Sequence, residues 1–191
     1  MLQDRMKYTQ DRSRAAQENI IKAARELMVS NGFETTTTEA IAARAGVSKA
    51  SIFAHFGDKT NLLIAVGIER MQQLNTHDDA ASVYEFYLPW YEFMVQNPDF
   101  AHLYFSQSNL PKGRWSKQFN QSCNGQEGAV ASIISRLAPS RLNAPHPAAF
   151  YARGAQAFFY QTVLYRNAGW LESDQTALNG LRDSLDIWLG D

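Results

Sequence analysis

The sequence predicts an all-α protein of about nine helices. Three observations support this. Apolar residues recur at spacings of three and four along most of the 191 residues, Ser and Thr residues precede several of these stretches as helix caps, and no stretch alternates in the manner of a strand. Hydrophobic residues make up 45% of the chain and charged residues 19%, which is typical of a folded globular protein rather than a disordered or fibrous one.

The N-terminal part predicts one long helix followed by a short one. Residues 15–31 carry apolar side chains at helical spacing, and Gly32 supplies a left-handed C-cap. Thr36 and Glu39 form a capping-box pattern that opens a short helix ending at Gly46. We expect a solvated, partly disordered terminus before residue 15. A basic arm for a DNA minor groove is the alternative, and its side chains are Arg5, Lys7, Arg12 and Arg14.

A tight turn, Ala45-Gly46-Val47-Ser48, separates this short helix from a third one. Ser48 is its expected N-cap, and Ile52 and Phe56 share one of its faces. A helix that reads DNA must be braced at a fixed angle by the helix before it, and a glycine turn sealed by an apolar residue meets this need. Taken alone, these features also fit an ordinary αα-hairpin in a helical bundle.

The rest of the chain predicts further helices. Residues 58–74 read as a longer connecting helix, and later helices are expected at 82–96, 128–137, 148–168 and 174–189. Pro89 is expected to kink the helix in which it lies. Residues 106–126 are rich in Ser, Asn, Gln and Gly and support no prediction. An irregular connection is marked by Pro139, Pro145 and Pro147.

Composition excludes several classes of protein. The net charge is −1, and residues 1–60 are only mildly basic, which permits a nucleic-acid surface without requiring one. The chain has no apolar run long enough for a membrane helix and no signal peptide, so we expect a cytoplasmic protein with no membrane partner. One cysteine, Cys123, and four scattered histidines give no disulfide framework and no metal-ligand spacing. Because catalytic and nucleotide-binding motifs are also missing, we expect a non-enzyme without metal or cofactor.

One stretch has many residues at fixed spacing that match a known pattern: Gly32-Phe33-x-x-Thr36-Thr37-Thr38-x-x-Ile41-Ala42-x-x-Ala45-Gly46-Val47-Ser48-x-x-x-Ile52-Phe53-x-His55-Phe56-x-x-Lys59-x-x-Leu62. It resembles the TetR family of bacterial transcription repressors. The resemblance covers about 50 residues from the first helix to the start of the fourth. It implies a helix-turn-helix DNA-binding domain over 1–57 and a helical effector-binding and dimerisation domain over 58–191. The expected partners are a second copy, a palindromic DNA operator and a small-molecule effector that releases a repressor.

The resemblance also implies individual DNA-contacting residues. Thr37 and Thr38 match phosphate-contacting positions at a helix N-terminus, which attracts anions. Lys49 and Ala50 occupy the start of the recognition helix, where side chains reach base edges. Phe53 stands where the family commonly has Tyr, so a phosphate contact through that hydroxyl is lost. The full implied set is Thr37, Thr38, Ser48, Lys49, Ala50, Ser51, Phe53, His55 and Lys59.

Residues 84–105 contain nine aromatic side chains in 22 positions, more than one apolar stripe of a helix requires. We therefore expect the wall of a pocket, with plain core packing as the alternative for each residue. Charged residues in this region are acidic, which favours a largely apolar or aromatic effector over an anionic one. The candidate ligand-binding residues are Tyr87, Trp90, Tyr91, Met94, Phe100, His102, Tyr104 and Phe158.

The last two helices predict a dimer interface. Leucines near the C-terminus recur at a coiled-coil-like spacing, and small residues such as Gly154 allow helices to approach closely. The resemblance implies that these helices pair with those of a second copy, whereas the alternative is that they seal the core of one chain. The predicted interface residues are Phe150, Gly154, Phe158, Leu178, Leu181, Leu185 and Trp188.

Two readings of function remain open at this point. The first is the repressor described above, with activation instead of repression as a variant that the sequence does not separate. The second is a small helical ligand carrier or enzyme that has an αα-hairpin and does not bind DNA. The second reading predicts ligand binding or turnover without any salt-dependent affinity for DNA.

Overall fold

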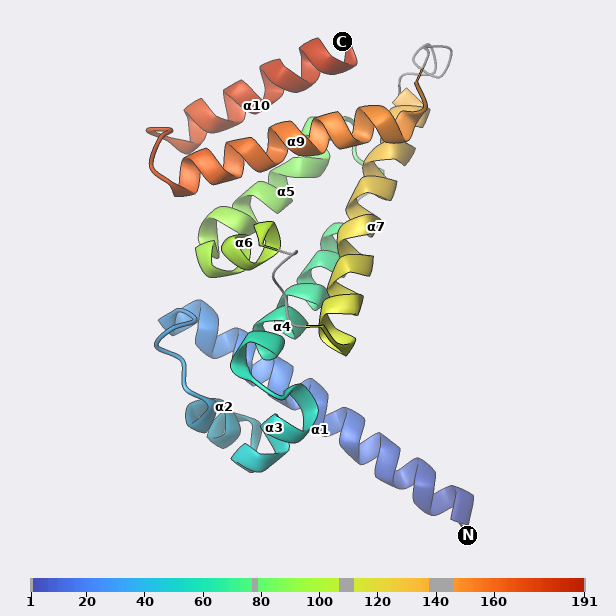
Figure 1. The fold of residues 1–191 in the computed structure, drawn as a ribbon, viewed down its shortest axis with the longest axis vertical. Helices are drawn as coiled ribbons and strands as arrows, with labels where there is room; N and C mark the ends of the chain where they lie inside the picture. Colours follow the sequence, from blue (N-terminus) through green and yellow to red (C-terminus); the bar gives the residue numbers. More distant parts are fainter. Residues whose placement is uncertain (1, 77–78, 107–111, 138–145, 191) are drawn as a thin grey trace. The chain divides into compact units, whose positions relative to one another are not determined.

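The computed structural model describes residues 2–76, 79–106, 112–137 and 146–190, and within these ranges it contains nine helices and no strand (Figure 1). The all-α prediction is therefore confirmed. The chain divides into two compact units, Met1–Ile68 and Glu69–Asp191. The division falls inside the fourth helix, α4 (Lys59–Leu74), whereas the predicted domain boundary lies just before it. None of the helices described is both long and apolar enough to cross a membrane.

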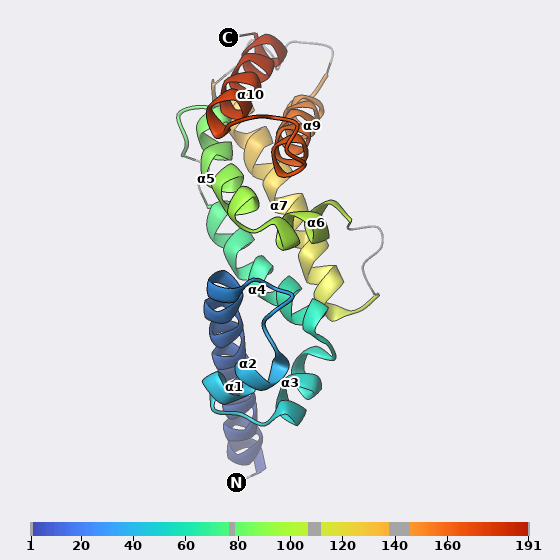
Figure 2. The same cartoon turned by 90° about the vertical axis from the view of Figure 1, so that its left-hand side faces the viewer.

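The first unit is built on one long helix. That helix, α1 (Leu2–Asn31), packs against α2 (Thr38–Ala45) and α3 (Lys49–Phe56), as Figure 2 shows. Because α2 and α3 have only eight residues each, neither would be stable as an isolated helix in water. Burial of apolar side chains on all three helices stabilises them, and the buried set includes Ile20, Ala24, Met28, Ile41, Ile52 and Phe56.

The start of α1 differs from the prediction. The helix begins at Leu2, whereas the apolar pattern predicts a start at residue 15 and a partly disordered terminus. The additional turns have no buried stripe for a periodicity argument to detect, because the side chains described between Lys7 and Ala15 are exposed. Local contacts support the helix here. Arg14 Nε lies 3.5 Å from a carboxylate oxygen of Glu18, and the Arg12 guanidinium lies 5.7 Å from the ring centroid of Tyr8.

The second unit is organised around a single central helix. That helix, α9 (Ala148–Asn167), contacts α5 (Val83–Gln96), α6 (Pro98–Phe105), α7 (Arg114–Leu137) and α10 (Asp174–Leu189). Figures 1 and 2 both show α9 and α10 lying side by side. The predicted bounds of α10 are confirmed, and Ser82 caps the start of α5. Pro139 and Pro145 of the predicted connection lie outside the described residues.

The long helix α7 is the main addition to the predicted elements. It has 24 residues, whereas the sequence pattern supports only residues 128–137. Ser, Asn and Gly are weak helix formers, and their density in residues 106–126 hides the helix from a propensity argument. Tertiary packing overrides this weakness, because α7 buries a stripe at spacings of three and four: Trp115, Phe119, Ser122, Gln126, Val130 and Ile133. The short helix α6, absent from the prediction, starts with Pro98 at its first position, where the missing N–H costs nothing.

The contact between α9 and α10 predicts a sharp steric requirement. A Cβ atom at Gly154 would lie 2.4 Å from Cε2 and Cζ2 of Trp188, whose indole is held by an Nε1–H bond to the Tyr151 carbonyl at 2.9 Å. Gly154→Ala should therefore lower the free energy of unfolding by about 1–3 kcal/mol, as expected for overpacking. Urea unfolding followed by circular dichroism measures this change.

Gly180→Ala is the matched control, because a Cβ there meets nothing within 4 Å. Gly180 is exposed on α10, so the alanine should leave stability unchanged or raise it by up to about 1 kcal/mol. A Gly154→Ala variant as stable as Gly180→Ala would contradict the close packing of α9 on α10.

Candidate nucleic-acid interface and ligand-binding interior

The turn between α2 and α3 fixes the direction of α3. Gly46 has φ = 67°, the left-handed region in which a glycine meets no steric penalty. The Val47 N–H donates to the Ala42 carbonyl at 3.0 Å and closes the turn. Ile52 and Phe56 of α3 are 1% and 2% exposed, so the inner face of α3 is tied into the core of the first unit. The recognition helix is therefore held at a defined angle.

Two predicted DNA-contacting residues cap these helices. Thr37 Oγ1 accepts a hydrogen bond from the Ala40 N–H at 3.1 Å, and Ser48 Oγ accepts one from the Ser51 N–H at 3.1 Å. The caps satisfy one backbone N–H at each helix start. The other N–H groups of the first turn, together with the helix dipole, favour an anion at this end of each helix.

The outer face of α3 carries the side chains predicted to read bases. Lys49 and Ala50 are exposed, and Phe53 is 46% exposed. The Lys49 ammonium forms an ion pair with Glu39 of α2 and lies 5.8 Å from the ring centroid of Phe53. The hydrogen bond from Lys49 lowers the pKa of the Glu39 carboxyl. Ser51 is half-buried on the same helix. These residues form one surface of mixed cationic and apolar character, which suits phosphate and base edges.

The three other predicted residues are placed differently. Lys59 is half-buried, donates to the Glu34 carbonyl at 3.1 Å, and lies 4.3 Å from the ring centroid of Phe33. It therefore fastens the start of α4 to the loop before α2, a contact that spacing alone did not reveal. Thr38 is half-buried and donates to Glu39 Oε2 at 3.1 Å. His55 is half-buried, and its ring lies 6.1 Å from that of Phe56.

The interior of the second unit holds five of the eight predicted ligand residues. All five are at most 2% exposed: Tyr87, Trp90, Met94, Phe100 and Tyr104. Their rings pack against aromatic side chains of other helices. The Tyr87 ring stacks on Phe159 of α9 with centroids 4.4 Å apart, and Phe100 meets Phe119 of α7 at 5.9 Å. The aromatic-rich segment therefore forms a shared interior of α5, α6, α7 and α9.

The remaining three predicted ligand residues lie outside this interior. His102 is exposed on α6, because it lies on the side of that short helix opposite Phe100 and Tyr104. Phe158 is half-buried and packs its ring 6.0 Å from that of Trp188, against α10. Tyr91 is buried but turns towards Asp174, to which its hydroxyl donates at 2.9 Å.

Sequence reasoning missed a polar network in this interior. The Tyr104 hydroxyl donates to Gln126 Oε1 at 3.0 Å, and Gln156 Nε2 donates to the same oxygen at 2.8 Å. The hydroxyls of Tyr104 and Tyr160 lie 2.8 Å apart. Burial raises the pKa of Tyr104 well above its usual value, so its proton stays in the network. The sequence did contain a signal for this network. Gln126 is spaced from Phe119 and Val130 so that it lies on the same buried face of α7.

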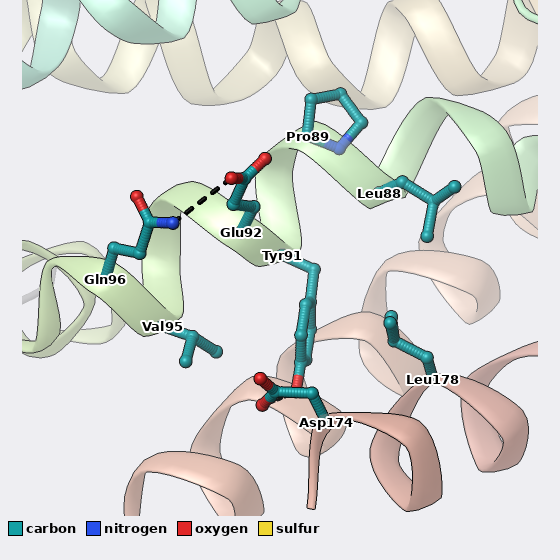
Figure 3. Close-up of a pocket in the computed structure, with 8 residues that line it drawn as sticks. All are labelled: Leu88, Pro89, Tyr91, Glu92, Val95, Gln96, Asp174 and Leu178. Atoms are coloured by element: carbon teal, nitrogen blue, oxygen red, sulfur yellow. Dashed lines mark hydrogen bonds between the residues drawn. The ribbon is translucent and has the colours of Figure 1, made fainter.

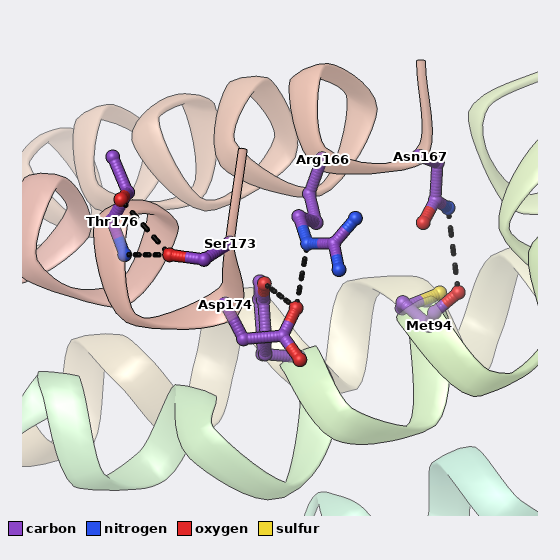
Figure 4. Close-up of polar contacts among 7 residues, drawn as sticks. Met94, Arg166, Asn167, Ser173, Asp174 and Thr176 are labelled. Carbon is purple, nitrogen blue, oxygen red and sulfur yellow. Dashed lines mark hydrogen bonds and ion pairs between the residues drawn. The ribbon is translucent and has the colours of Figure 1, made fainter. Parts of the chain in front are cut away.

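A surface groove lies between α5 and α10 (Figure 3). It encloses about 470 Å³ and is lined by Leu88, Pro89, Tyr91, Glu92, Val95, Gln96, Asp174 and Leu178. At its edge Arg166 Nε donates to Asp174 Oδ1 at 2.6 Å, as Figure 4 shows. The hydrogen bonds from Tyr91 and Arg166 lower the pKa of Asp174. Ser173 caps α10 beside this ion pair, so the edge of the groove is the capped N-terminus of α10.

Several predicted dimer residues lie within the chain's own packing. Leu181 and Leu185 are 1% exposed and face the core of the second unit, and Trp188 covers Gly154. Phe150 and Phe158 are half-buried, with their rings about 6 Å from that of Trp188. Leu178 is half-buried at the groove. The leucine spacing therefore describes the seam between α9 and α10 of one chain, and for Leu181 and Leu185 this corrects the prediction.

Comparison with known proteins agrees with this geometry. The sequence model described as "Bacterial regulatory proteins, tetR family" matches residues 20–66, which include α2, the turn and α3. Residues 20–66 thus belong to the DNA-binding region of the TetR type. The resemblance on which the sequence analysis relied is thereby confirmed.

Curated HTH-type transcriptional regulators are similar in part of their length. The HTH-type transcriptional repressor AcnR of Corynebacterium glutamicum is 34% identical over 59 residues, which are 31% of this chain and 31% of AcnR. The alignment thus spans about a third of that relative. The HTH-type transcriptional activator FasR of Mycolicibacterium smegmatis is 26% identical over 165 residues, or 82% of this chain and 72% of FasR.

The fold extends the likeness over both units. The structure of Thermus thermophilus FadR, a TetR-family repressor in complex with lauroyl-CoA, superposes with a TM-score of 0.70 at 19% identity. The match covers 91% of this chain and 93% of FadR. At this identity the comparison establishes a shared TetR-type fold.

Cys123 provides a test of the interior. Its thiol is buried on α7, and burial raises its pKa to about 12. Because the thiolate is the reactive form, a disulfide reagent at neutral pH should leave Cys123 unmodified in the folded protein and react with it rapidly after unfolding in urea. Absorbance of the released thiolate measures both rates, and fast modification of the folded protein would contradict the burial of Cys123.

Proposed function

We propose that the protein is a cytoplasmic homodimeric transcriptional repressor that binds a palindromic operator and is released by a small, largely apolar or aromatic effector. The observation that supports this most strongly is the capped and braced α3, whose exposed face carries Lys49, Ala50 and Phe53. This helix lies within the residues that match the TetR family. The aromatic interior of the second unit is the proposed region for the effector.

In the proposed complex, each α3 enters a major groove, which admits one α-helix. Lys49 donates to guanine, while Ala50 and Phe53 meet thymine methyl groups or sugar. The N-termini of α2 and α3 approach phosphates through backbone N–H groups and the hydroxyls of Thr37, Thr38, Ser48 and Ser51. His55 and Lys59 complete the phosphate contacts. Lys59 has three N–H groups, so its bond to Glu34 leaves donors for a phosphate.

The outer faces of α9 and α10 are the proposed surface for the second copy. Exposed positions recur there at helical spacing: Ala157, Gln161, Leu164 and Ala168 along α9 and its cap, then Thr176, Gly180, Asp183 and Ile187 along α10. Leu164 is 47% exposed and Ile187 is 84% exposed. Small and apolar side chains on one face allow the close helix contact that a four-helix interface needs. This surface replaces the buried leucines of the original prediction.

The conformational signal that releases DNA is proposed to be transmitted by α4. This helix is the covalent link between the units, because residues 59–68 belong to the first and residues 69–74 to the second. An effector that favours one arrangement of the second unit changes the direction of α4 and hence the spacing of the two reading helices. Such coupling requires the effector to bind the two arrangements with different affinity.

The fold also suits a ligand carrier that does not bind DNA, and activation suits it as well as repression. The relatives include a repressor and an activator, so the sign of regulation depends on where the operator lies relative to a promoter.

Selection of genomic fragments by the purified protein at about 150 mM salt distinguishes a carrier from a regulator. A regulator enriches a palindromic site, and a carrier enriches none. Effector retained through purification would mimic a carrier, so the selection is repeated after unfolding and refolding.

Lys49→Ala tests the assignment of the recognition helix. We expect operator binding to weaken by about 1–3 kcal/mol and base preference to relax at the contacted position, because a bidentate base contact is lost. Fluorescence anisotropy on the selected site and on single-base variants measures both effects. Glu39→Gln, which removes the ion-pair partner of Lys49, should strengthen binding to all sequences.

Lys117→Ala is the matched control, since Lys117 is exposed on α7 in the second unit. It removes the same charge and should leave base preference intact. Unchanged affinity and preference in Lys49→Ala, or an equal loss in Lys117→Ala, would refute the role of α3.

A further inference from the structure

Among the residues that the structure describes in the second unit, three hydrogen-bond donors are buried without an acceptor. They are Tyr87 Oη, Trp90 Nε1 and Gln126 Nε2, and all three residues are 0% exposed. A buried donor that makes no hydrogen bond is unfavourable, because it has lost its bonds to water. Three such groups in one interior indicate that something other than the chain itself supplies their acceptors.

Two of the three donors, Trp90 and Gln126, belong to residues in contact with Tyr104. Tyr87 and Trp90 lie three residues apart on α5 and therefore share a face. The Trp90 ring lies 6.1 Å from the Tyr104 ring, and the Tyr104 hydroxyl binds Gln126. Tyr87 stacks on Phe159, the chain neighbour of Tyr160, whose hydroxyl meets that of Tyr104. The donors thus belong to one cluster from α5, α6, α7 and α9.

The Gln126 oxygen in this cluster is already occupied. Gln126 Oε1 receives hydrogen bonds from Tyr104 and Gln156, which occupy both of its lone pairs. With Tyr104 donating to Gln126, the proton between the two tyrosines comes from Tyr160. The Gln126 amide hydrogens therefore face away from the network unpaired. Among the described residues the fourth buried unpartnered atom is an acceptor, Asn75 Oδ1, and its amide binds the Ser122 carbonyl one turn before Gln126 on α7.

No Lys or Arg side chain among the described residues is placed to pair with an acidic ligand in this interior. Every Lys and Arg side chain described in the second unit is exposed except Arg166, which is half-buried and pairs with Asp174. A carboxylate placed in the cluster would lose its hydration without gaining a counter-charge. A carbonyl or ether oxygen accepts the same hydrogen bonds at a much smaller desolvation cost.

We propose that this cluster binds an apolar molecule through a neutral acceptor oxygen, such as that of a ketone, ester or amide, with Tyr87, Trp90 and Gln126 as donors. The assignment of this molecule as the effector rests on the proposed function. Aromatic rings of Tyr104 and Phe159 contact its apolar body. Tyr87→Phe removes one unpaired donor. It should therefore stabilise the ligand-free protein and weaken its binding of the ligand.

Three probes with the same number of non-hydrogen atoms test the proposal: acetophenone, isopropylbenzene and benzoate. Binding to the full chain at neutral pH, without DNA, is measured by ligand-detected NMR. We expect acetophenone to bind about tenfold tighter than isopropylbenzene, the effect of two modest hydrogen bonds, and benzoate to bind most weakly. Tyr87→Phe should reduce the preference for acetophenone several-fold and leave the affinity for isopropylbenzene unchanged.

Tyr84→Phe is the matched control, because Tyr84 is on the same helix but is half-buried beneath the guanidinium of Arg182, 4.4 Å from its ring centroid. It should leave all three affinities unchanged. Equal affinities for the three probes, tightest binding of benzoate, absence of binding up to the solubility limit, or an unchanged preference in Tyr87→Phe would overturn the proposal. The probe measurements contain no DNA and are therefore independent of operator binding. A protein that binds no operator but still prefers acetophenone would refute the proposed function and leave the binding proposal standing.

Discussion

The structure of the first unit depends on one constraint, namely that an eight-residue helix has no stability of its own in water. α3 exists because Ser48 caps it, Gly46 lets the chain turn in front of it, and Ile52 and Phe56 are buried beneath it. The same contacts that make α3 stable also fix its angle. Exposure of Lys49 is therefore a consequence of how the inner face is buried, which links the folding of this unit directly to what it presents to DNA.

In the second unit, by contrast, some buried residues are unfavourable for stability. Its interior is mostly aromatic and well packed, yet it includes three donors whose hydrogen bonds the chain does not satisfy. A core built only for stability would replace Tyr87 by Phe, since an unpaired buried donor costs free energy. Sites that violate such local rules are where function is expected. The polar cluster thus connects the proposed effector to the packing of α5, α7 and α9.

The sequence predicted those features that depend on local signals. The Ser48 cap, the glycine turn and the bounds of α10 are all local, and each is found. The cap of α2 is Thr37, one residue after the predicted Thr36, whose hydroxyl instead donates to the Gly32 carbonyl. Features set by tertiary packing were not predictable. Most of α7 is weakly helical by composition, and the start of α1 has no buried stripe. Helical spacing identified Leu181 and Leu185 as an apolar face but did not reveal whether their own chain or a second copy covers it.

The most direct test of this account is a hydroxyl-radical footprint of the protein on a genomic fragment that it selects. Two copies of α3 in successive major grooves predict two protected patches related by the palindrome, with centres about 34 Å or one helical turn apart. The patches should disappear together as salt is raised, because phosphate contacts dominate the affinity. A single patch, or uniform protection without a preferred site, would contradict the proposal that a dimer reads DNA through α3.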